Sequence, residues 1–217
     1  MEWIKTSQSN LNELAAKWIY GRVQYYLSSC GRVALGVSGG SSPLEMLEIL
    51  FSHFSQLEAK NLFVFQVDER FVSPDNPNSN QIKIGSRIPS HIKDRFFPID
   101  ILSNIEETQW AYEKKLSLFG SGLDIVLLGL GTDGHAASLF SDENLRLKGR
   151  LCITQCSNYH RVGFTSDYIL KAKEIVFFVP GSDKKSIIDE FMCPESNIVA
   201  RHIPNHHSQV TFFSGQD

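Results

Sequence analysis

The chain lacks both a long hydrophobic run and an excess of positive charge. None of its apolar stretches approaches the roughly 20 residues that a membrane-spanning helix requires. Lys and Arg number 21 against 24 Asp and Glu, a formal net charge of −3, whereas nucleic acids and anionic membranes attract basic surfaces. We therefore expect no nucleic-acid partner and no membrane partner, and an anionic ligand would need cations that are placed locally.

The N-terminus lacks the features of a secretory leader. Its first ten residues, MEWIKTSQSN, contain neither a basic segment nor an apolar segment. We therefore expect a cytoplasmic location.

Residues arranged as metal ligands are scarce as well. The four cysteines form no Cys-x-x-Cys pair, and three clustered histidines near the C-terminus have no clear acidic or cysteine companion. These residues are Cys30, Cys152, Cys156, Cys193, His202, His206 and His207. We expect no metal and no cofactor, and we interpret the histidines as part of a solvated tail.

The order of apolar runs and helical periods predicts an α/β protein. With 217 residues, 42% of them hydrophobic, and no internal repeat, the chain fits one domain over residues 1–217. We expect strands at 33–37, 62–67, 125–128, 151–156 and 175–179, and helices at 10–28, 43–54 and 104–119. Residues 73–104 are expected to form a long functional loop with short helical pieces. This alternation predicts a three-layer α/β/α, Rossmann-like domain with a mostly parallel sheet.

The sequence LDIVLLGLGTDGHAASLF, residues 123–140, combines a buried strand with a glycine-rich loop. We expect a helix to begin at Ala136, so that the loop would join a strand to a helix N-terminus, where α/β proteins bind ligands. The loop carries an acid, Asp133, and a titratable base, His135, two residues apart. A capping aspartate beside an incidental histidine is the alternative interpretation.

A second strand, turn and helix start lies at residues 33–43, VALGVSGGSSP. Ser42 with Glu45 predicts a capping box, with Pro43 at the first helical position. Ser38, Gly39, Gly40 and Ser41 form a plausible phosphate cradle through their backbone N–H groups. Because neither a Walker A motif nor GxGxxG is present, nucleotide binding is not indicated.

A third motif, Asp68-Glu69-Arg70, closes the run 62–67 and is followed by Ser79-Asn80. SGGSSP, DER with a downstream SN, and GLGTDGHAASLF, in this order and spacing, resemble the 6-phosphogluconolactonase family. The resemblance covers about residues 10 to 190. This family belongs to the wider sugar-phosphate isomerase-like group, which also contains glucosamine-6-phosphate deaminase.

The resemblance implies an enzyme that hydrolyses 6-phospho-D-glucono-1,5-lactone, a sugar phosphate of the pentose phosphate pathway. His135 would be the general base, kept neutral by the dipole of the expected helix, and Asp133 would orient the ring or favour its cationic state. Backbone N–H groups near Gly131 to Gly134, or a guanidinium, would contact the oxyanion. The phosphate would be bound by the Gly39–Ser41 cradle and by a cation from the set Arg70, Arg161 and Lys184, and Asp68 would bind sugar hydroxyls.

Two alternatives remain open at this stage. A deaminase is disfavoured because Arg70 replaces the tyrosine of that group's DEY motif, and residues 138–140 replace its Phe-Asn-Glu. A non-catalytic sugar-phosphate-binding regulator stays open because Thr132 and Ser141 depart from the lactonase pattern, whereas the intact pair of Asp133 and His135 favours the enzyme. Gly163, in place of the hydroxyl residue after Arg161-Val162, is a further departure from that pattern. The sequence leaves the oligomeric state open, and we expect a monomer or a weak homo-oligomer.

Overall fold

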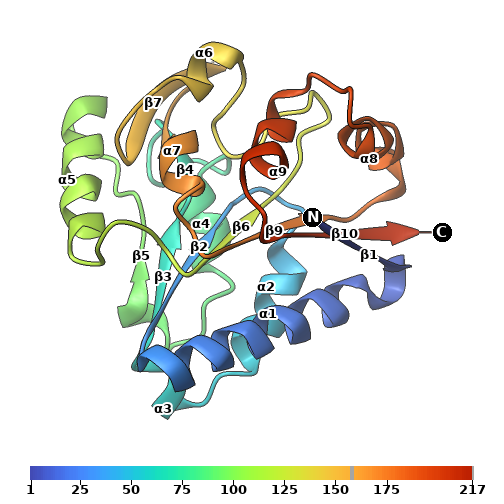
Figure 1. Ribbon diagram of the computed structural model, residues 1–217. Helices are drawn as coiled ribbons and strands as arrows, with labels where there is room; N and C mark the ends of the chain where they lie inside the picture. Colours follow the sequence, from blue (N-terminus) through green and yellow to red (C-terminus); the bar gives the residue numbers. More distant parts are fainter. Residues whose placement is uncertain (157–158, 217) are drawn as a thin grey trace.

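A seven-stranded sheet, ordered β1-β10-β9-β6-β2-β3-β5, forms the centre of the protein (Figure 1). The computed structural model describes residues 1–156 and 159–216. Its strands are Glu2–Ser7 (β1), Val33–Val37 (β2), Leu62–Gln66 (β3), Phe96–Phe97 (β5), Ile125–Leu128 (β6), Glu174–Val179 (β9) and Val210–Gln216 (β10). Every pairing between these strands is parallel.

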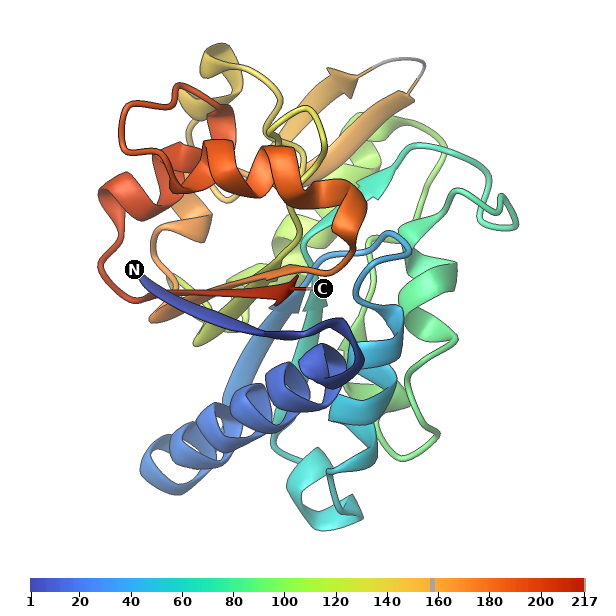
Figure 2. The same cartoon turned by 90° about the vertical axis from the view of Figure 1, so that its right-hand side faces the viewer.

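Helices cover both faces of this sheet because its strand side chains are apolar on both sides. In β9, Val176 and Phe178 pack into one core, whereas Ile175 and Phe177 pack into the other. The first face carries α1 (Gln8–Cys30), α2 (Leu44–Ser52) and α4 (Asn80–Gly85), and the second carries α5 (Ile105–Ser117), α7 (Ser166–Ile169), α8 (Lys185–Met192) and α9 (His202–His206). Figure 2 shows α1 and α8 on opposite sides of the strands. The expected three-layer α/β/α fold is confirmed.

The remaining elements are short. They are α3 (Gln56–Ala59), α6 (Asp142–Leu145), and the 3₁₀ turns η1 (Lys93–Arg95), η2 (Ser182–Lys184) and η3 (Val199–Arg201). The expected loop at 73–104 contains α4, η1 and the two-residue strand β5.

The chain changes direction across the sheet between its two central strands. After β2 it proceeds outward through β3 to β5, and it then returns to β6, on the other side of β2, before continuing to β9 and β10. Such a switch point leaves a crevice at the carboxyl ends of the two central strands, where open α/β sheets bind ligands. The two glycine-rich segments of the sequence follow β2 and β6, so both lie at this crevice.

A small antiparallel sheet, β4-β8-β7, extends from the end of β3. It consists of Asp68–Arg70 (β4), Leu151–Cys156 (β7) and Tyr159–Phe164 (β8). In its register Asp68 lies opposite Gly163, and Arg70 lies opposite Arg161. The pairing therefore brings an arginine from late in the chain beside the DER motif.

Local details at three helix starts differ from the sequence predictions. Helix α1 begins at Gln8, two residues before the expected Asn10. The prediction of a capping box at Ser42 is wrong, because α2 begins at Leu44 after Pro43 without a side-chain cap. The Ser42 residue lines a pocket instead. No helix begins at Ala136, because Ala137 adopts a left-handed backbone with φ 53° and residues 136–139 form a turn.

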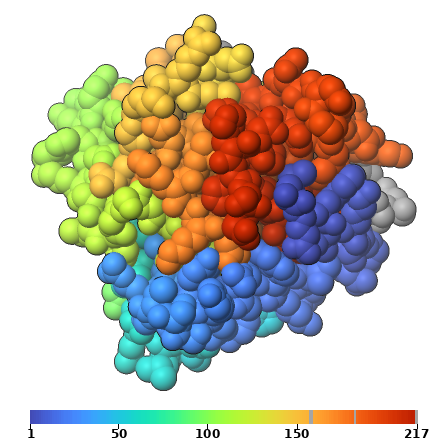
Figure 3. Space-filling view, viewed as in Figure 1, coloured from blue at the N-terminus to red at the C-terminus, as the bar shows by residue number. Residues whose placement is uncertain are grey.

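The two ends of the described chain form adjacent strands that the sequence analysis missed. Strand β1 pairs with β10 in parallel. Figure 3 shows the N-terminal segment (blue) and the C-terminal segment (red) side by side on one face of the molecule. The interpretation of residues 202–213 as a solvated tail is wrong: α9 and β10 pack into the fold, and His207 Nε2 lies 2.8 Å from the carbonyl oxygen of Ala172. Within the described residues, no helix is long and apolar enough to cross a membrane.

Candidate active site

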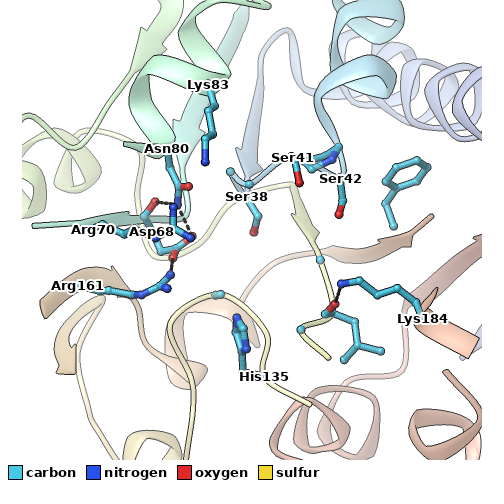
Figure 4. A pocket seen from close by; sticks show the side chains of 18 residues that line it. Ser38, Ser41, Ser42, Asp68, Arg70, Asn80, Lys83, His135, Arg161 and Lys184 are labelled. Carbon is cyan, nitrogen blue, oxygen red and sulfur yellow. Dashed lines mark hydrogen bonds and ion pairs between the residues drawn. The ribbon is translucent and has the colours of Figure 1, made fainter. Parts of the chain in front are cut away.

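A polar pocket of about 280 Å³ opens at the switch point of the sheet (Figure 4). Nine of the ten residues predicted for the site line it: Ser38, Gly39, Gly40, Ser41, Asp68, Arg70, His135, Arg161 and Lys184. Asp133 does not line the pocket and contacts His135 instead. The segments that follow β2, β3 and β6 therefore meet in one pocket.

The turn after β2 presents backbone donors that the protein does not use. Among the described residues, no acceptor is bound to the N–H groups of residues 39–42. The turn depends on glycine at two positions: Gly40 has φ +92°, and a Cβ on Gly39 would lie 2.3 Å from Cγ of Asn80. The Ser38 hydroxyl is also buried in the pocket wall, with no hydrogen-bond partner in the part of the chain that the structure describes. Convergent, unused donors of this kind favour an anion.

The loop after β6 is held by its own hydrogen bonds. Gly131 N donates to His135 O over 2.8 Å, Gly134 N donates to Gly131 O over 3.0 Å, and Ala200 N from η3 donates to Gly134 O over 2.9 Å. The amides of Gly131 and Gly134 are therefore occupied and unavailable to an oxyanion, whereas the Thr132 amide has no acceptor among the described residues. The argument that a helix dipole keeps His135 neutral is also wrong, since no helix begins there.

His135 and Asp133 form a pair whose geometry the loop fixes. The ring Nδ1 of His135 contacts Oδ1 of Asp133, and the ring lies 4.6 Å from that of Phe140. Partial burial alone would raise the pKa of the Asp133 carboxyl, but the hydrogen bond and charge of His135 outweigh it and hold that pKa below its ordinary value. With Nδ1 directed at the carboxylate, Nε2 is the nitrogen left to act on a ligand.

Gly131 makes this contact between the two side chains possible. A Cβ at this position would lie 2.2 Å from Nδ1 of His135 and 2.4 Å from Oδ1 of Asp133. Any side chain at residue 131 would therefore displace the pair.

Asp68 lies on a second wall of the pocket, in a buried polar cluster. Its Oδ2 accepts from the Ser138 hydroxyl over 2.9 Å and forms an ion pair with Arg161 Nη1 at 3.3 Å. The Asn80 amide donates to the Asp68 backbone oxygen over 3.1 Å. Arg161 also lies over the Phe140 ring, 5.1 Å from its centroid, and its buried Nε has no partner among the described residues. Because these contacts fix Arg161, its guanidinium is preorganised at the pocket edge.

The other predicted cations are bound to backbone oxygens. Arg70 Nη1 donates to Asn78 O over 2.6 Å, and Lys184 Nζ donates to Leu130 O. Burial lowers the pKa of Lys184, an effect that the charges of Asp183 and Asp133 oppose. Lys184 is thus a half-buried cation at the end of β9, beside both glycine-rich segments.

Several pocket residues were not predicted from the sequence, and Asn80 and Lys83 are the most informative of them. Asn80 belongs to the Ser79-Asn80 motif and was not assigned a role. The three-residue spacing between Asn80 and Lys83 would have placed both on one helix face, had one of the short helical pieces expected within 73–104 been located there. Among the described residues, no group of three or more His, Cys, Asp or Glu side chains could hold a metal.

Comparisons with known proteins agree with this architecture. A family model described as "Glucosamine-6-phosphate isomerases/6-phosphogluconolactonase" matches residues 6–212. The 6-phosphogluconolactonase of Nostoc sp. is 31% identical over 183 residues, 78% of this chain and 75% of that protein. The structure of 6-phosphogluconolactonase from Thermotoga maritima matches with a TM-score of 0.88 at 22% identity and covers 99% of both chains.

A solved monomeric glucosamine-6-phosphate deaminase also shares the fold, with a TM-score of 0.81 at 20% identity, over 100% of this chain and 98% of that chain. The fold alone thus does not separate the two activities. The family resemblance that the three motifs predicted is confirmed: the chain belongs to the family of glucosamine-6-phosphate isomerases and 6-phosphogluconolactonases.

Proposed function

We propose that this protein hydrolyses 6-phospho-D-glucono-1,5-lactone to 6-phosphogluconate. One observation carries the proposal: a paired imidazole, His135, and a turn of unused backbone donors, residues 39–42, line the same pocket. Hydrolysis of a phosphorylated lactone requires both a base that activates water and a site for the phosphate. The relatives named 6-phosphogluconolactonase support the choice of substrate.

His135 acts as the general base in this mechanism. Its Nδ1–H donates to Asp133, so the lone pair of Nε2 accepts a proton from water while the water oxygen attacks C1 of the lactone. This attack turns the carbonyl oxygen into an oxyanion on a tetrahedral carbon. When the C=O bond re-forms, the bond between C1 and the ring oxygen breaks. The imidazolium returns its proton to that ring oxygen, which becomes the 5-hydroxyl of the product. Asp133 stabilises the transient imidazolium.

Other pocket groups hold the substrate and its developing charge. The amides of residues 39–42 and the Lys184 ammonium bind the phosphate through charge-assisted hydrogen bonds. Arg161 is the cation we assign to the oxyanion, because Asp68 orients its guanidinium at the pocket edge and the amides of Gly131 and Gly134 are occupied. Asp68 itself accepts from a sugar hydroxyl, and Arg70 adds positive charge at the pocket rim.

The alternatives make different demands on the pocket. Deamination with ring opening calls for a further acid, whereas Asp68 is the one carboxylate among the lining residues that the structure describes, and it is already bound to Ser138 and Arg161. A binding protein without activity would need no base. We further propose one domain over residues 1–217, working in the cytoplasm as a monomer or weak homo-oligomer without metal or cofactor.

The test is the disappearance of freshly prepared 6-phosphogluconolactone, corrected for spontaneous hydrolysis. The unphosphorylated lactone and glucosamine 6-phosphate serve as comparison substrates. We expect turnover of the phosphorylated lactone, weaker turnover of the unphosphorylated one, and no release of ammonia from glucosamine 6-phosphate. Binding of 6-phosphogluconate without lactone turnover would instead support the regulator, and ammonia release would support the deaminase.

A further inference from the structure

Helix α4 is fixed to the pocket wall by a buried carboxylate. Glu69 is fully buried, and its oxygens accept from Asn80 N over 2.8 Å, Gln81 N over 2.6 Å and the Ser79 hydroxyl over 3.1 Å. These bonds hold the first turn of the helix. One turn later, Lys83 lies on the same face as Asn80, and Figure 4 shows both side chains directed into the pocket.

Lys83 differs from the other pocket cations because its ammonium has no hydrogen bond and no ion pair with any of residues 1–156 and 159–216. By contrast, Arg70 and Lys184 donate to backbone oxygens, and Arg161 pairs with Asp68. Burial and the nearby charge of Arg70 lower the pKa of Lys83, and the charge of Glu69 only partly opposes them. A cation held in this way is stabilised when an anion enters the pocket.

We propose that Lys83 is a specificity-determining residue that binds the phosphate of the substrate, opposite the amides of residues 39–42. This inference rests on the proposed function, because it assigns a ligand group within the same site. It adds a contact that none of the three sequence motifs contains.

The position of Lys83 in the pocket indicates that it contacts the phosphate of the substrate rather than the lactone carbon that reacts. Figure 4 shows Lys83 on the side of the pocket that carries Ser38 and Ser41, with His135 on the opposite side. The base must lie at the lactone carbonyl, so a cation across the pocket meets another part of the substrate. A phosphate dianion is the substrate group with enough charge to offset an otherwise unpaired ammonium.

The test measures binding without turnover, by calorimetry with 6-phosphogluconate, gluconate and inorganic phosphate. Lys83→Met removes the charge and keeps much of the side-chain length, Lys83→Arg keeps the charge, and Lys185→Met is the matched control at an exposed lysine outside the pocket. We expect Lys83→Met to lower the affinity for 6-phosphogluconate about ten- to a hundredfold and also to lower the affinity for inorganic phosphate. Gluconate binding should be unchanged, Lys83→Arg should keep most of the affinity, and Lys185→Met should behave as wild type.

Several results would overturn the inference. These are unchanged affinity of Lys83→Met for 6-phosphogluconate, an equal loss for gluconate, or wild-type protein that does not bind 6-phosphogluconate. The outcomes also separate the two proposals. A wild-type protein that hydrolyses the lactone while Lys83→Met binds normally contradicts the role of Lys83 alone. A protein that binds through Lys83 but does not hydrolyse the lactone contradicts the hydrolase alone.

Discussion

The two glycine-rich segments at the switch point have similar sequences but differ in how their backbone amides are bonded. Both follow a central parallel strand, and both were expected to lead directly into a helix. The amides of the turn at residues 39–42 have no acceptor among the described residues, and the turn does lead into α2. The loop at residues 129–140 uses the amides of Gly131 and Gly134 internally, is held by η3, and does not lead directly into a helix.

This difference indicates a division of labour within the pocket. A segment with free backbone donors can bind an anion through the main chain, and its side chains matter little. A segment held by hydrogen bonds between its own backbone groups acts mainly through its side chains, and these bonds hold the side chains rigidly. The first segment is therefore suited to bind phosphate, and the second is suited to hold His135 in position.

The largest effect should follow removal of the base. We expect His135→Ala to lower kcat roughly 10²–10⁴-fold with KM for the phosphorylated lactone nearly unchanged, because proton transfer is lost while the phosphate contacts remain. Steady-state kinetics, corrected for spontaneous hydrolysis, checks this. His160→Ala, at an exposed histidine on β8 outside the pocket, is the control and should behave as wild type.

His135→Asn sharpens this prediction. It should be as slow as His135→Ala if the ring transfers a proton, and partly active if the ring only donates a hydrogen bond. Near-wild-type turnover by folded His135→Ala would mean that catalysis depends on Asp68 or on electrostatics alone.

Gly131→Ala should have the next largest effect, because the new methyl group would overlap the ring and carboxylate of the His135–Asp133 pair. A displacement of about 1 Å can cost roughly a hundredfold in rate, so we expect a loss of about ten- to a hundredfold, mainly in kcat. Gly21→Ala, in α1 with no atom within 4 Å of the added Cβ, is the control. A normal kcat for Gly131→Ala would contradict the rigid placement of the pair.

Alanine substitutions in the other segment should affect binding. In Gly39→Ala the added methyl group would overlap the Asn80 side chain, so either the turn or α4 must move. We therefore expect KM for the phosphorylated lactone to rise by about tenfold, with a smaller change in kcat. In Gly40→Ala the added Cβ has no described atom within 4 Å, so the only cost is the backbone strain of the positive φ, about 1 kcal/mol. It should therefore raise KM less. A larger effect on kcat than on KM at Gly39 would contradict the division of labour.

The smallest effect concerns the pH dependence set by Asp133. The pKa of the Asp133 carboxyl is held below its ordinary value by the hydrogen bond and charge of His135, which outweigh its partial burial. Activity should fall in acid as the base is lost, and Asp133→Asn, which removes the negative charge beside the ring, should move this fall to lower pH. Because both side chains are partly exposed, we expect this shift to be small. A shift to higher pH in the kcat profile would show that the carboxylate does not act through the ring.

The central sheet and most of the site could be predicted from sequence because they depend on local pattern. The apolar run 125–128 is buried on both faces and has no polar residue, so its interpretation as a strand was straightforward. By contrast, strand 2–7 is half-exposed at the sheet edge, and only its pairing with β10 makes it a strand. Residues whose roles depend on tertiary contacts were therefore harder to predict.

The same reasoning explains the errors within the site. Residues 136–139 have good helix propensity, but the left-handed backbone at Ala137 and the bond from Ser138 to Asp68 prevent a helix. Lys83 was missed because its position depends on the bonds from Glu69 to the start of α4, a contact that no periodicity in the sequence indicates.

The most direct test of the division of labour is a titration of ¹⁵N-labelled protein with inorganic phosphate, followed through backbone amide signals. Phosphate is small enough to report on its own binding site without filling the rest of the pocket. The account predicts large, saturable shifts for the amides of residues 39–42 and little change for those of Gly131 and Gly134, whose N–H groups are already bonded. Saturable shifts at Gly131 and Gly134, with the amides of residues 39–42 unmoved, would contradict it.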